Sequence, residues 1–506
     1  MKKKIFRAMA ILLILVLVMT GCAKTEETQR TTDDRTDVTN GVAGSADEGG
    51  SSSGSDKGDA RDEGGSGVLD LFGSVFTAAE AKGSASDDGS TGYFISDAAV
   101  PSAKYDSYSD YDYSEAMRDY AGGEYERSGG SYDEDGVPCD PVVIRPSAGI
   151  LTAGEWNDNL HYDFFKNLIN NGQEREYSQM LTRWKLTPFS RLAIHVSDIT
   201  TDVESARTEG VSGSAIYTDG LQNARVTVFN SDGAQIWQSK TDNKGMTYVY
   251  YRLNGGQDIP SAVKVEYNGV ESTTSVENAD LLDNAVMDIR LNCTEDNTKK
   301  LDLMFVIDTT GSMGDEIVYL QKELEDVIER VEKQNANIPV RLSCNFYRDL
   351  GDEYVVRTNE FTTDINNMLS ILNSEYADGG GDYEEAVEMA LEDAVNNHSW
   401  NESSTKLMFL VLDAPPHNTD QIADSLAKTL NDAIAKGIRI IPIASSGIDK
   451  ETEFLLRAFA MTTGGTYTFL TDDSGVGNGH IEPTVGQYDV EYLNDMLVRI
   501  ISDYIY

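Results

Sequence analysis

Three oxygen-bearing side chains stand directly after a strongly apolar run. Residues 303–307 are Leu-Met-Phe-Val-Ile, and Asp308, Thr310 and Ser312 follow within the next few positions. We interpret the apolar run as a buried strand, so the carboxylate and the two hydroxyls would be held at its end on a rigid support. Hard cations such as Mg²⁺ prefer oxygen ligands of this kind. The stretch therefore predicts a cation site.

Two later segments carry carboxylates in comparable settings. Asp382 follows three glycines in residues 379–386, and Asp413 follows the apolar run 407–412 and precedes two prolines and a histidine. Taken singly, these aspartates have structural explanations: Asp308 could cap the next helix, and Asp413 could serve a turn. Taken together and in this order, they favour a metal site built from three loops.

The elements that must position these loops alternate along residues 298–506. Nearly all-apolar strands separated by amphipathic helices are typical of a mostly parallel, doubly wound α/β sheet covered on both faces. Ligand sites in such sheets lie at the carboxyl ends of the strands, where Asp308 is expected. We expect strands near 301–307, 339–346, 406–412, 438–444 and 466–470, and a closing helix near 490–504.

On its three loop segments, the region 298–506 resembles a von Willebrand factor type A (VWFA) domain, which has a Rossmann-like fold. The resemblance implies a metal-ion-dependent adhesion site (MIDAS), in which the hydroxyls of Thr310 and Ser312 would ligate a divalent ion directly. Asp308 and Asp413 would hold ligating waters or contact the ion themselves. The resemblance covers about two fifths of the chain.

The second loop departs from the family pattern, because Asp382 stands where threonine is common. A third carboxylate would satisfy Mg²⁺ more fully, with Mn²⁺ or Ca²⁺ as alternatives. It could also weaken the recruitment of a carboxylate from a partner, which is the adhesive mechanism that the resemblance implies. The resemblance therefore implies the binding of an ion more directly than the binding of a partner that offers an acidic oxygen.

The chain begins with features of an export signal. Lysines and an arginine precede the apolar run 8–19, which is shorter than the roughly 20 residues that a spanning helix needs. Residues 19–23, Met-Thr-Gly-Cys-Ala, resemble a bacterial lipobox, which implies a lipoprotein signal at 1–22 and lipidation of Cys22. The alternative is an ordinary cleaved signal with a chance cysteine. We expect a protein held to the cell membrane by lipid alone, on the extracytoplasmic side.

Composition divides the region between signal and α/β domain into three parts. Residues 23–140 are rich in Gly, Ser and Asp, which predicts a disordered tether. Residues 141–190 have apolar residues at helical spacing, which predicts a helical segment. Residues 191–297 alternate apolar and polar positions between turns, which predicts an antiparallel β-sandwich-like module. Part of that module weakly resembles carboxypeptidase-regulatory or transthyretin-like modules.

Net charge and cysteine content narrow the class of function. A formal net charge of -44 excludes nucleic-acid binding, which needs a cationic surface. It favours solubility on a crowded surface, with attraction of cations or basic partners as the alternative. Cys139 and Cys293 border the expected modules and could pair, whereas Cys344 lies in an expected core strand.

The sequence thus predicts a surface-anchored lipoprotein that binds a protein or other macromolecule through a divalent ion. The alternative is an envelope assembly or stress scaffold in which the metal site is only structural. We do not expect an enzyme, because no nucleophile–base pair is recognised and no His-Glu-x-x-His motif occurs in the chain.

Overall fold

The computed structural model describes residues 146–506, apart from 171–174 and 211–214, and the backbone of four short strands before them. Those strands are β1 (Tyr125–Arg127), β2 (Ser131–Tyr132), β3 (Pro138–Cys139) and β4 (Val142–Ile144). The predicted signal with Cys22, nearly all of the tether and the Cys139 side chain lie outside the described residues. Among the helices that are described, none combines the length and apolar composition needed to cross a bilayer.

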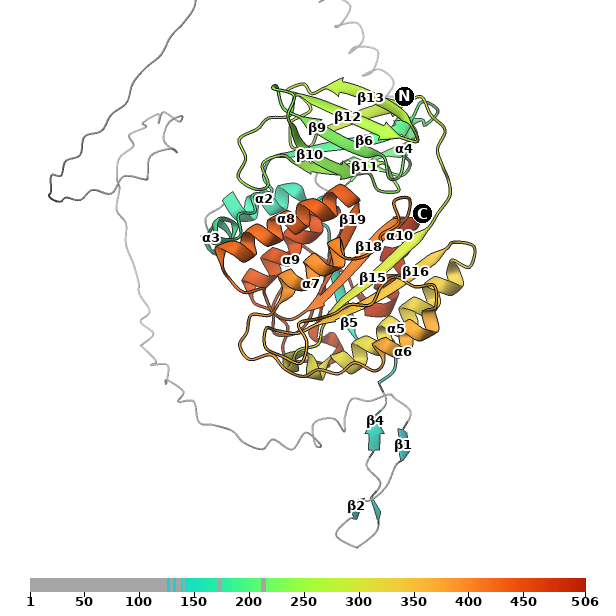
Figure 1. Cartoon of the computed structure of the whole chain (residues 1–506), viewed down its shortest axis with the longest axis vertical. Helices are drawn as coiled ribbons and strands as arrows, with labels where there is room; N and C mark the ends of the chain where they lie inside the picture. The colour runs from blue at the N-terminus through green and yellow to red at the C-terminus, as the bar shows by residue number, and fades with distance from the viewer. Residues whose placement is uncertain are drawn as a thin grey trace, which may run out of the picture. The chain divides into compact units, whose positions relative to one another are not determined.

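The α/β domain is built on one sheet of eight strands, most of them parallel (Figure 1). From the central strand β15 the chain moves to one side and later to the other, so β15 flanks the topological switch point of the sheet. The strands in spatial order are β17 (Val356–Arg357), β16 (Val340–Tyr347), β15 (Leu301–Asp308), β18 (Thr405–Leu412), β19 (Ile438–Ala444), β20 (Tyr467–Leu470), β5 (Thr152–Trp156) and β21 (Val490–Tyr492).

Helices cover both faces of this sheet, as the sequence predicts. Alternate residues of β15 face opposite sides, because successive side chains of a strand point in opposite directions. Phe305 packs into the core under one layer of helices, and Met304 packs into the core under the other. The first layer holds α5 (Ile317–Gln334), α6 (Ile365–Leu372) and α10 (Leu493–Ile505), and the second holds α7 (Val387–Asn396), α8 (Asp420–Lys436) and α9 (Lys450–Thr463).

The segment 141–190 requires a correction, because it is not only helical. It contains α2 (Tyr162–Asn170) and α3 (Arg175–Trp184), but its strand β5 lies between β20 and β21 and is antiparallel to both. Gly154 permits this insertion, since an added Cβ would lie 2.5 Å from the ring of Phe469. Asp158, just after β5, accepts hydrogen bonds of 2.9 and 2.7 Å from the buried Arg457 guanidinium of α9. The segment is therefore an integral part of the α/β domain.

A second module, residues 191–297, packs as two facing sheets. Val226 and Val263 of one sheet share a buried core with Ile194 and Ile289 of the other, which agrees with a sandwich-like arrangement. The pairing is not wholly antiparallel as expected, because β14 runs parallel to β6. One sheet holds β10 (Gln235–Lys240), β9 (Arg225–Phe229), β12 (Ala262–Tyr267) and β13 (Val270–Ser275), and the other holds β11 (Met246–Tyr250), β6 (Arg191–Asp198) and β14 (Val286–Leu291).

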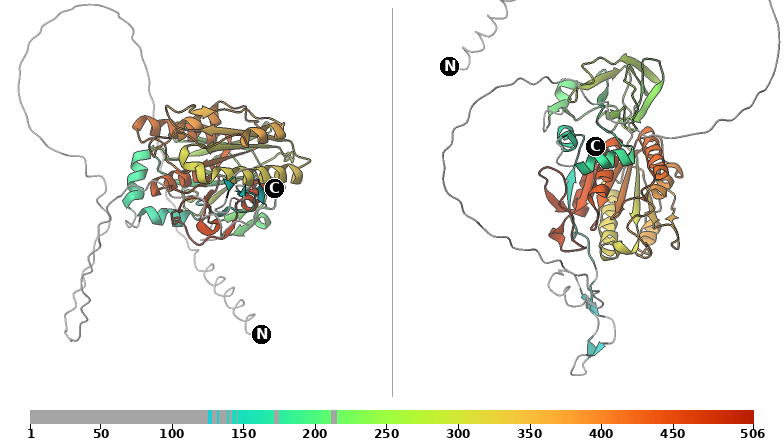
Figure 2. Two further views of the ribbon diagram at one scale, coloured as in Figure 1. Left: turned by 90° about the horizontal axis from the view of Figure 1, so that it is seen from below. Right: turned by 90° about the vertical axis from the view of Figure 1, so that its left-hand side faces the viewer.

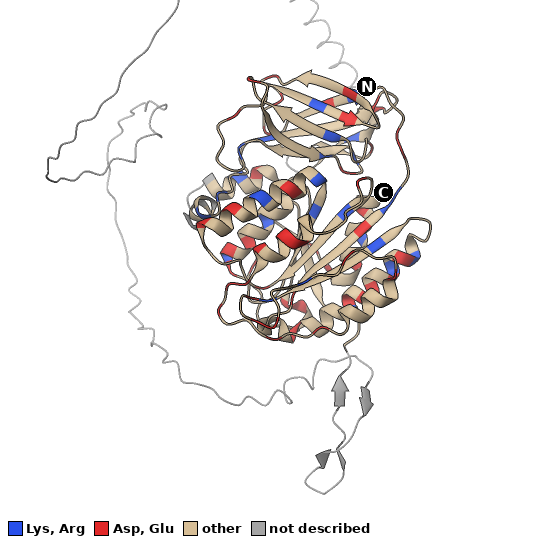
Figure 3. Ribbon diagram, viewed as in Figure 1, with Lys and Arg blue, Asp and Glu red and all other residues tan. Residues whose placement is uncertain are grey.

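This β module sits at the end of the α/β sheet where the parallel strands begin (Figures 1 and 2). Several Lys and Arg residues lie along the junction, coloured blue on the ribbon of Figure 3. Arg439 of β19 donates to the carbonyl of Lys240 at 2.7 Å, and the Lys240 ammonium pairs with Glu402 at 2.5 Å. The carboxyl ends of the parallel strands point away from the β module, so the predicted metal loops lie at the opposite end of the domain.

Candidate metal centre

The first predicted loop folds its oxygen atoms together at the end of β15. Thr310 donates to Asp308 Oδ1 from both its hydroxyl, at 2.7 Å, and its backbone amide, at 2.9 Å. The hydroxyls of Thr310 and Ser312 lie 3.2 Å apart. Asp308 and Thr310 are fully buried, whereas Ser312, in the 3₁₀ turn Gly311–Asp315, is exposed. The loop therefore presents a carboxylate and two hydroxyls in one cluster that opens to solvent at Ser312.

The third predicted loop lies beside the first because of strand register. Ile307 of β15 pairs with Val411 of β18, so Asp308 and Asp413 follow the ends of neighbouring strands. Asp413 is 4% exposed, and it lies close enough to Asp308 for the two charges to interact. The structure thus brings together four of the predicted ligands, which are Asp308, Thr310, Ser312 and Asp413.

The second loop is joined to the other two by backbone hydrogen bonds. Gly311 donates to the carbonyl of Gly379 at 3.2 Å, and Glu385 donates to the carbonyl of Pro415 at 2.9 Å. Gly379 and Gly380 have φ values of 83° and 73°, a region that favours glycine. An added Cβ at Gly380 would lie 3.0 Å from Glu385 Oε1 and would crowd this approach of the loops.

The carboxylate that the second loop turns toward the centre is Glu385 rather than Asp382. Glu385 is 3% exposed, and the charges of Asp308 and Asp413 both act on it. Asp382 is exposed, and its ligand atom lies with those of Asp349 and His417. The sequence analysis assigns the ligand of this loop to Asp382, not to Glu385. Its position two residues before α7, beside the apolar residues Ala386 and Val387, was the available signal.

The charge balance of the centre is strongly negative. Burial, opposed by hydrogen bonds from Thr310, raises the pKa of Asp308 to about 6. Burial and then the charge of Asp308 raise the pKa of Asp413 to about 7, and the same two causes raise that of Glu385 to about 9. Carboxyl groups gathered out of water repel one another and resist ionisation. A cation among them would reverse that effect.

Unsatisfied oxygens identify where a cation would fit. Asp308 Oδ2, Glu385 Oε2 and Asp413 Oδ1 are buried and have no hydrogen-bond partner within the described residues. The hydroxyls of Tyr347 and Ser312 are near Asp308 and Asp413, respectively, but make no hydrogen bond of normal geometry with them. Buried polar atoms normally have partners, so each exception needs an explanation such as an absent ion. The residues present therefore fit a hard divalent cation.

Comparison with known proteins gives this region a family. Residues 302–475, about a third of the chain, match the family model described as von Willebrand factor A domain. The chain contains a von Willebrand factor A domain. The match begins within β15 and ends past η4 (Asp472–Ser474), so it includes all three loops. The mostly parallel sheet and its two helical layers agree with that family.

One curated protein shares part of this sequence. It is the putative ariadne-like RING finger protein R811 of Acanthamoeba polyphaga mimivirus, 28% identical over 142 residues. The matched stretch is 28% of this chain and 13% of that protein. The chain therefore spans only a small part of that relative, and the likeness concerns a single region.

The remaining cysteines take no part in the centre. Cys344 is buried in β16 as expected, and Cys293 is a half-buried free thiol. The Cys139 side chain lies outside the described residues, so its pairing with Cys293 stays a prediction. Burial raises the pKa of both thiols.

Proposed function

We propose that the A domain binds a macromolecular partner through a divalent cation held by Asp308, Thr310, Ser312, Asp413 and Glu385. The observation that carries the proposal is the group of buried carboxylate oxygens without hydrogen-bond partners at the strand ends. Mg²⁺ suits such an all-oxygen site, with Mn²⁺ or Ca²⁺ as alternatives. When bound, the ion would supply positive charge and a coordination position for an acidic oxygen of the partner. Domains of this family commonly mediate protein–protein interaction through a metal site.

Exposed apolar side chains near the centre support a protein as the partner. Leu350, in the loop after β16, is 59% exposed, and Tyr383, in the second loop, is 42% exposed. Tyr376, just before the glycines of that loop, is 55% exposed. Protein interfaces typically surround a few polar contacts with aromatic and aliphatic side chains. In the proposal, these residues pack against the partner while the ion binds a carboxylate of the partner.

We further propose that the chain acts at the outer side of a cell membrane, as a binding protein and not as an enzyme. The support is in the sequence: the signal-like residues 1–22, the lipobox-like Cys22 and the Gly/Ser/Asp-rich stretch 23–140. A lipid chain on Cys22 and a long polar tether would let the A domain reach a partner away from the membrane. Mass spectrometry of the chain produced in bacteria tests the lipid on Cys22, and an unmodified Cys22 would contradict it.

Capture of the partner with and without metal tests the binding proposal. The full-length chain is immobilised, and extracellular proteins are applied in Mg²⁺ or in EDTA. We expect retained proteins to elute in EDTA, and we expect Asp308→Asn to retain none of them. Asp420→Asn is the matched control, because that carboxylate on α8 is 91% exposed and lies outside the centre. Retention that is equal in Mg²⁺, in EDTA and with Asp308→Asn would contradict the proposal.

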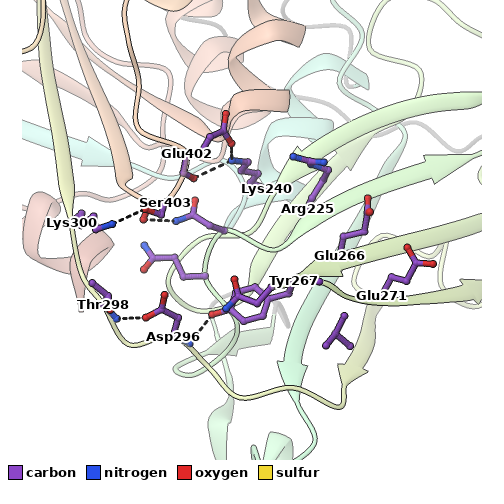
Figure 4. Close-up of a pocket in the computed structure, with 15 residues that line it drawn as sticks. Arg225, Lys240, Glu266, Tyr267, Glu271, Asp296, Thr298, Lys300, Glu402 and Ser403 are labelled. Atoms are coloured by element: carbon purple, nitrogen blue, oxygen red, sulfur yellow. Dashed lines mark hydrogen bonds and ion pairs between the residues drawn. The ribbon is translucent and has the colours of Figure 1, made fainter.

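A second candidate function is a scaffold whose partner binds at the β module. A polar pocket of about 420 Å³ lies at the junction of the β module with the A domain (Figure 4). Tyr267, Lys300 and Glu402 are among its lining residues. On this candidate, Tyr267→Ala and Lys300→Ala would abolish capture, whereas EDTA and Asp308→Asn would leave it unchanged.

A further inference from the structure

A histidine and two aspartates meet beside the metal centre, one from each of three loops. Asp349 follows β16, Asp382 belongs to the glycine-rich second loop, and His417 follows the two prolines after β18. One ligand atom from each of them lies within 4.8 Å of the other two. Asp349 is 7% exposed, His417 is partly buried and Asp382 is exposed, so the group runs from the interior to the surface.

One contact in this group has an ordinary explanation. The Nε2 atom of His417 lies 2.8 Å from Asp349 Oδ1, which is an aspartate–histidine pair of normal length. That pair does not account for Asp382, whose side chain makes no hydrogen bond within the part of the chain that the structure describes. Asp382 extends from a loop whose glycines bring it next to an already paired histidine.

Glu388, which lies near this group, gives an independent observation. It lies in the first turn of α7, is 8% exposed, and interacts electrostatically with both His417 and Asp349. Its Oε2 atom is buried and has no hydrogen-bond partner among the described residues. A carboxylate oxygen withheld from water without a partner costs free energy unless a ligand satisfies it.

We propose that Asp349, Asp382, Glu388 and His417 form a second cation site, separate from the all-oxygen centre and selective for a transition metal such as Zn²⁺. Imidazole nitrogen suits Zn²⁺ and similar ions, whereas Mg²⁺ prefers oxygen ligands. Bonds of about 2.0–2.2 Å hold ligand atoms within roughly 4 Å of one another, so the exposed Asp382 needs only a small side-chain rotation to join. This proposal does not depend on the proposed function.

Hydrogen bonds hold His417 and the loop of Asp349 in place for a shared ion. The aspartate–histidine contact fixes the imidazole of His417 toward Asp349. Asp349 is itself held in place, because its backbone amide donates to Asp352 Oδ2 at 3.0 Å and Gly380 donates to the same oxygen at 2.9 Å. The loop after β16 and the second loop are thus tied together beneath the site. Ligands held by the surrounding structure bind an ion without a large ordering cost.

Zn²⁺ binding by the metal-stripped, full-length chain tests the second site. Equilibrium dialysis is performed in excess Mg²⁺, which occupies the all-oxygen centre, and Co²⁺ absorption spectra then report nitrogen ligation. We expect one Zn²⁺ per chain, at least tenfold weaker affinity in His417→Ala and in Asp382→Asn, and unchanged affinity in Asp308→Asn. Circular dichroism establishes that each variant is folded.

A control variant at another histidine and a measurement of Mg²⁺ binding make the test decisive. His480→Ala is the control, because His480 also pairs with an aspartate, Asp472, at 2.8 Å but lies outside the group. Zn²⁺ affinity that is equal in wild type and His417→Ala would overturn the second site. Loss of Zn²⁺ binding in Asp308→Asn, or loss of Mg²⁺ binding in Asp382→Asn, would show a single shared centre and also overturn it. Loss of Mg²⁺ binding in Asp308→Asn alone leaves the second site intact and bears on the proposed function.

Discussion

The two ends of strand β15 carry the same buried residue type in opposite circumstances. Asp302, near its start, is 1% exposed and accepts hydrogen bonds from Arg341 at 3.0 and 2.5 Å and from the amide of Asn401 at 2.7 Å. Asp308, at its end, is fully buried, and one of its oxygens has no hydrogen-bond partner among the described residues. Both oxygens of Asp302 accept hydrogen bonds from the protein, whereas only one oxygen of Asp308 does.

The same difference extends to the neighbouring strands. Near the start of the sheet, Arg439 donates to the carbonyls of Thr463 and Lys240, both at 2.7 Å, and Lys406 donates to two backbone carbonyls. At the opposite end, Asp413 and Glu385 each have a buried oxygen without a hydrogen-bond partner in the part of the chain that the structure describes. Internally paired charges join the A domain to the β module and serve the architecture. Buried charges left without partners indicate a place for a ligand from outside the chain.

The largest expected effect that tests the contrast between Asp302 and Asp308 is on folding stability. We expect Asp302→Asn to lower the free energy of unfolding by roughly 2–4 kcal/mol, because it leaves Arg341 without its counter-charge. The figure is below that of a fully buried pair, since the Arg341 side chain is 26% exposed. In EDTA at pH 8, Asp308→Asn should keep or raise stability, because it removes a buried charge without a counter-charge.

Urea unfolding followed by circular dichroism measures both variants. Equal losses of stability in Asp302→Asn and Asp308→Asn would show that the two aspartates play the same structural part. The contrast between the two ends of β15 would then be lost. The contrast would be supported most strongly if the free energy of unfolding of Asp308→Asn, relative to wild type, were higher in EDTA and lower in Mg²⁺.

A second effect is the stabilisation supplied by the metal. An ion that binds only the folded chain adds about 2.7 kcal/mol at a concentration one hundred times its dissociation constant. We expect Mg²⁺ to give wild type a gain of that order, to give Asp302→Asn the same gain on a lower baseline, and to give Asp413→Asn little or none. Thermal unfolding at several Mg²⁺ concentrations measures the gain. Full stabilisation of Asp413→Asn by Mg²⁺ would show that Asp413 does not bind the ion.

Much of the A domain could be predicted from sequence because its signals are local. The apolar run ending at Asp308 and the one preceding Asp413 predict adjacent buried strands, and the parallel register then brings these aspartates together. Strand β5 could not be found in this way. Its Thr-Ala-Gly-Glu-Trp sequence is short and has little apolar periodicity, and its place between β20 and β21 depends on distant residues such as Phe469.

The second loop shows a different limit of sequence reasoning. The glycines before Asp382 predict a tight loop, but they do not show which of the acidic residues that follow turns inward. Positive φ angles at Gly379 and Gly380 reverse the chain, and the start of α7 then directs Glu385 inward while Asp382 remains exposed. The residues nearest to Asp382 in this group, Asp349 and His417, come from loops more than thirty residues away in each direction.

A third effect is a pH dependence at the start of β18. Burial, and then the charge of Lys240, lower the pKa of Lys406 from 10.5 to about 7. The unfolded chain therefore holds one more proton than the folded chain between pH 7 and about pH 10. Stability should rise with pH across that window, by at most about 1.4 kcal/mol per pH unit, and should be insensitive to Lys406 below it.

Lys406→Met removes this proton difference, so we expect a flatter stability profile from pH 7 to 10 and a higher free energy of unfolding at pH 6. Lys428→Met is the control, because that lysine of α8 is 69% exposed and should leave the profile unchanged. Urea unfolding at half-unit pH steps compares the three proteins. A profile for Lys406→Met that is parallel to wild type would mean that Lys406 stays charged in the fold. Its hydrogen bonds to two carbonyls would then fully offset the cost of burying its charge. The charges at this end of the sheet would be even better paired than we infer.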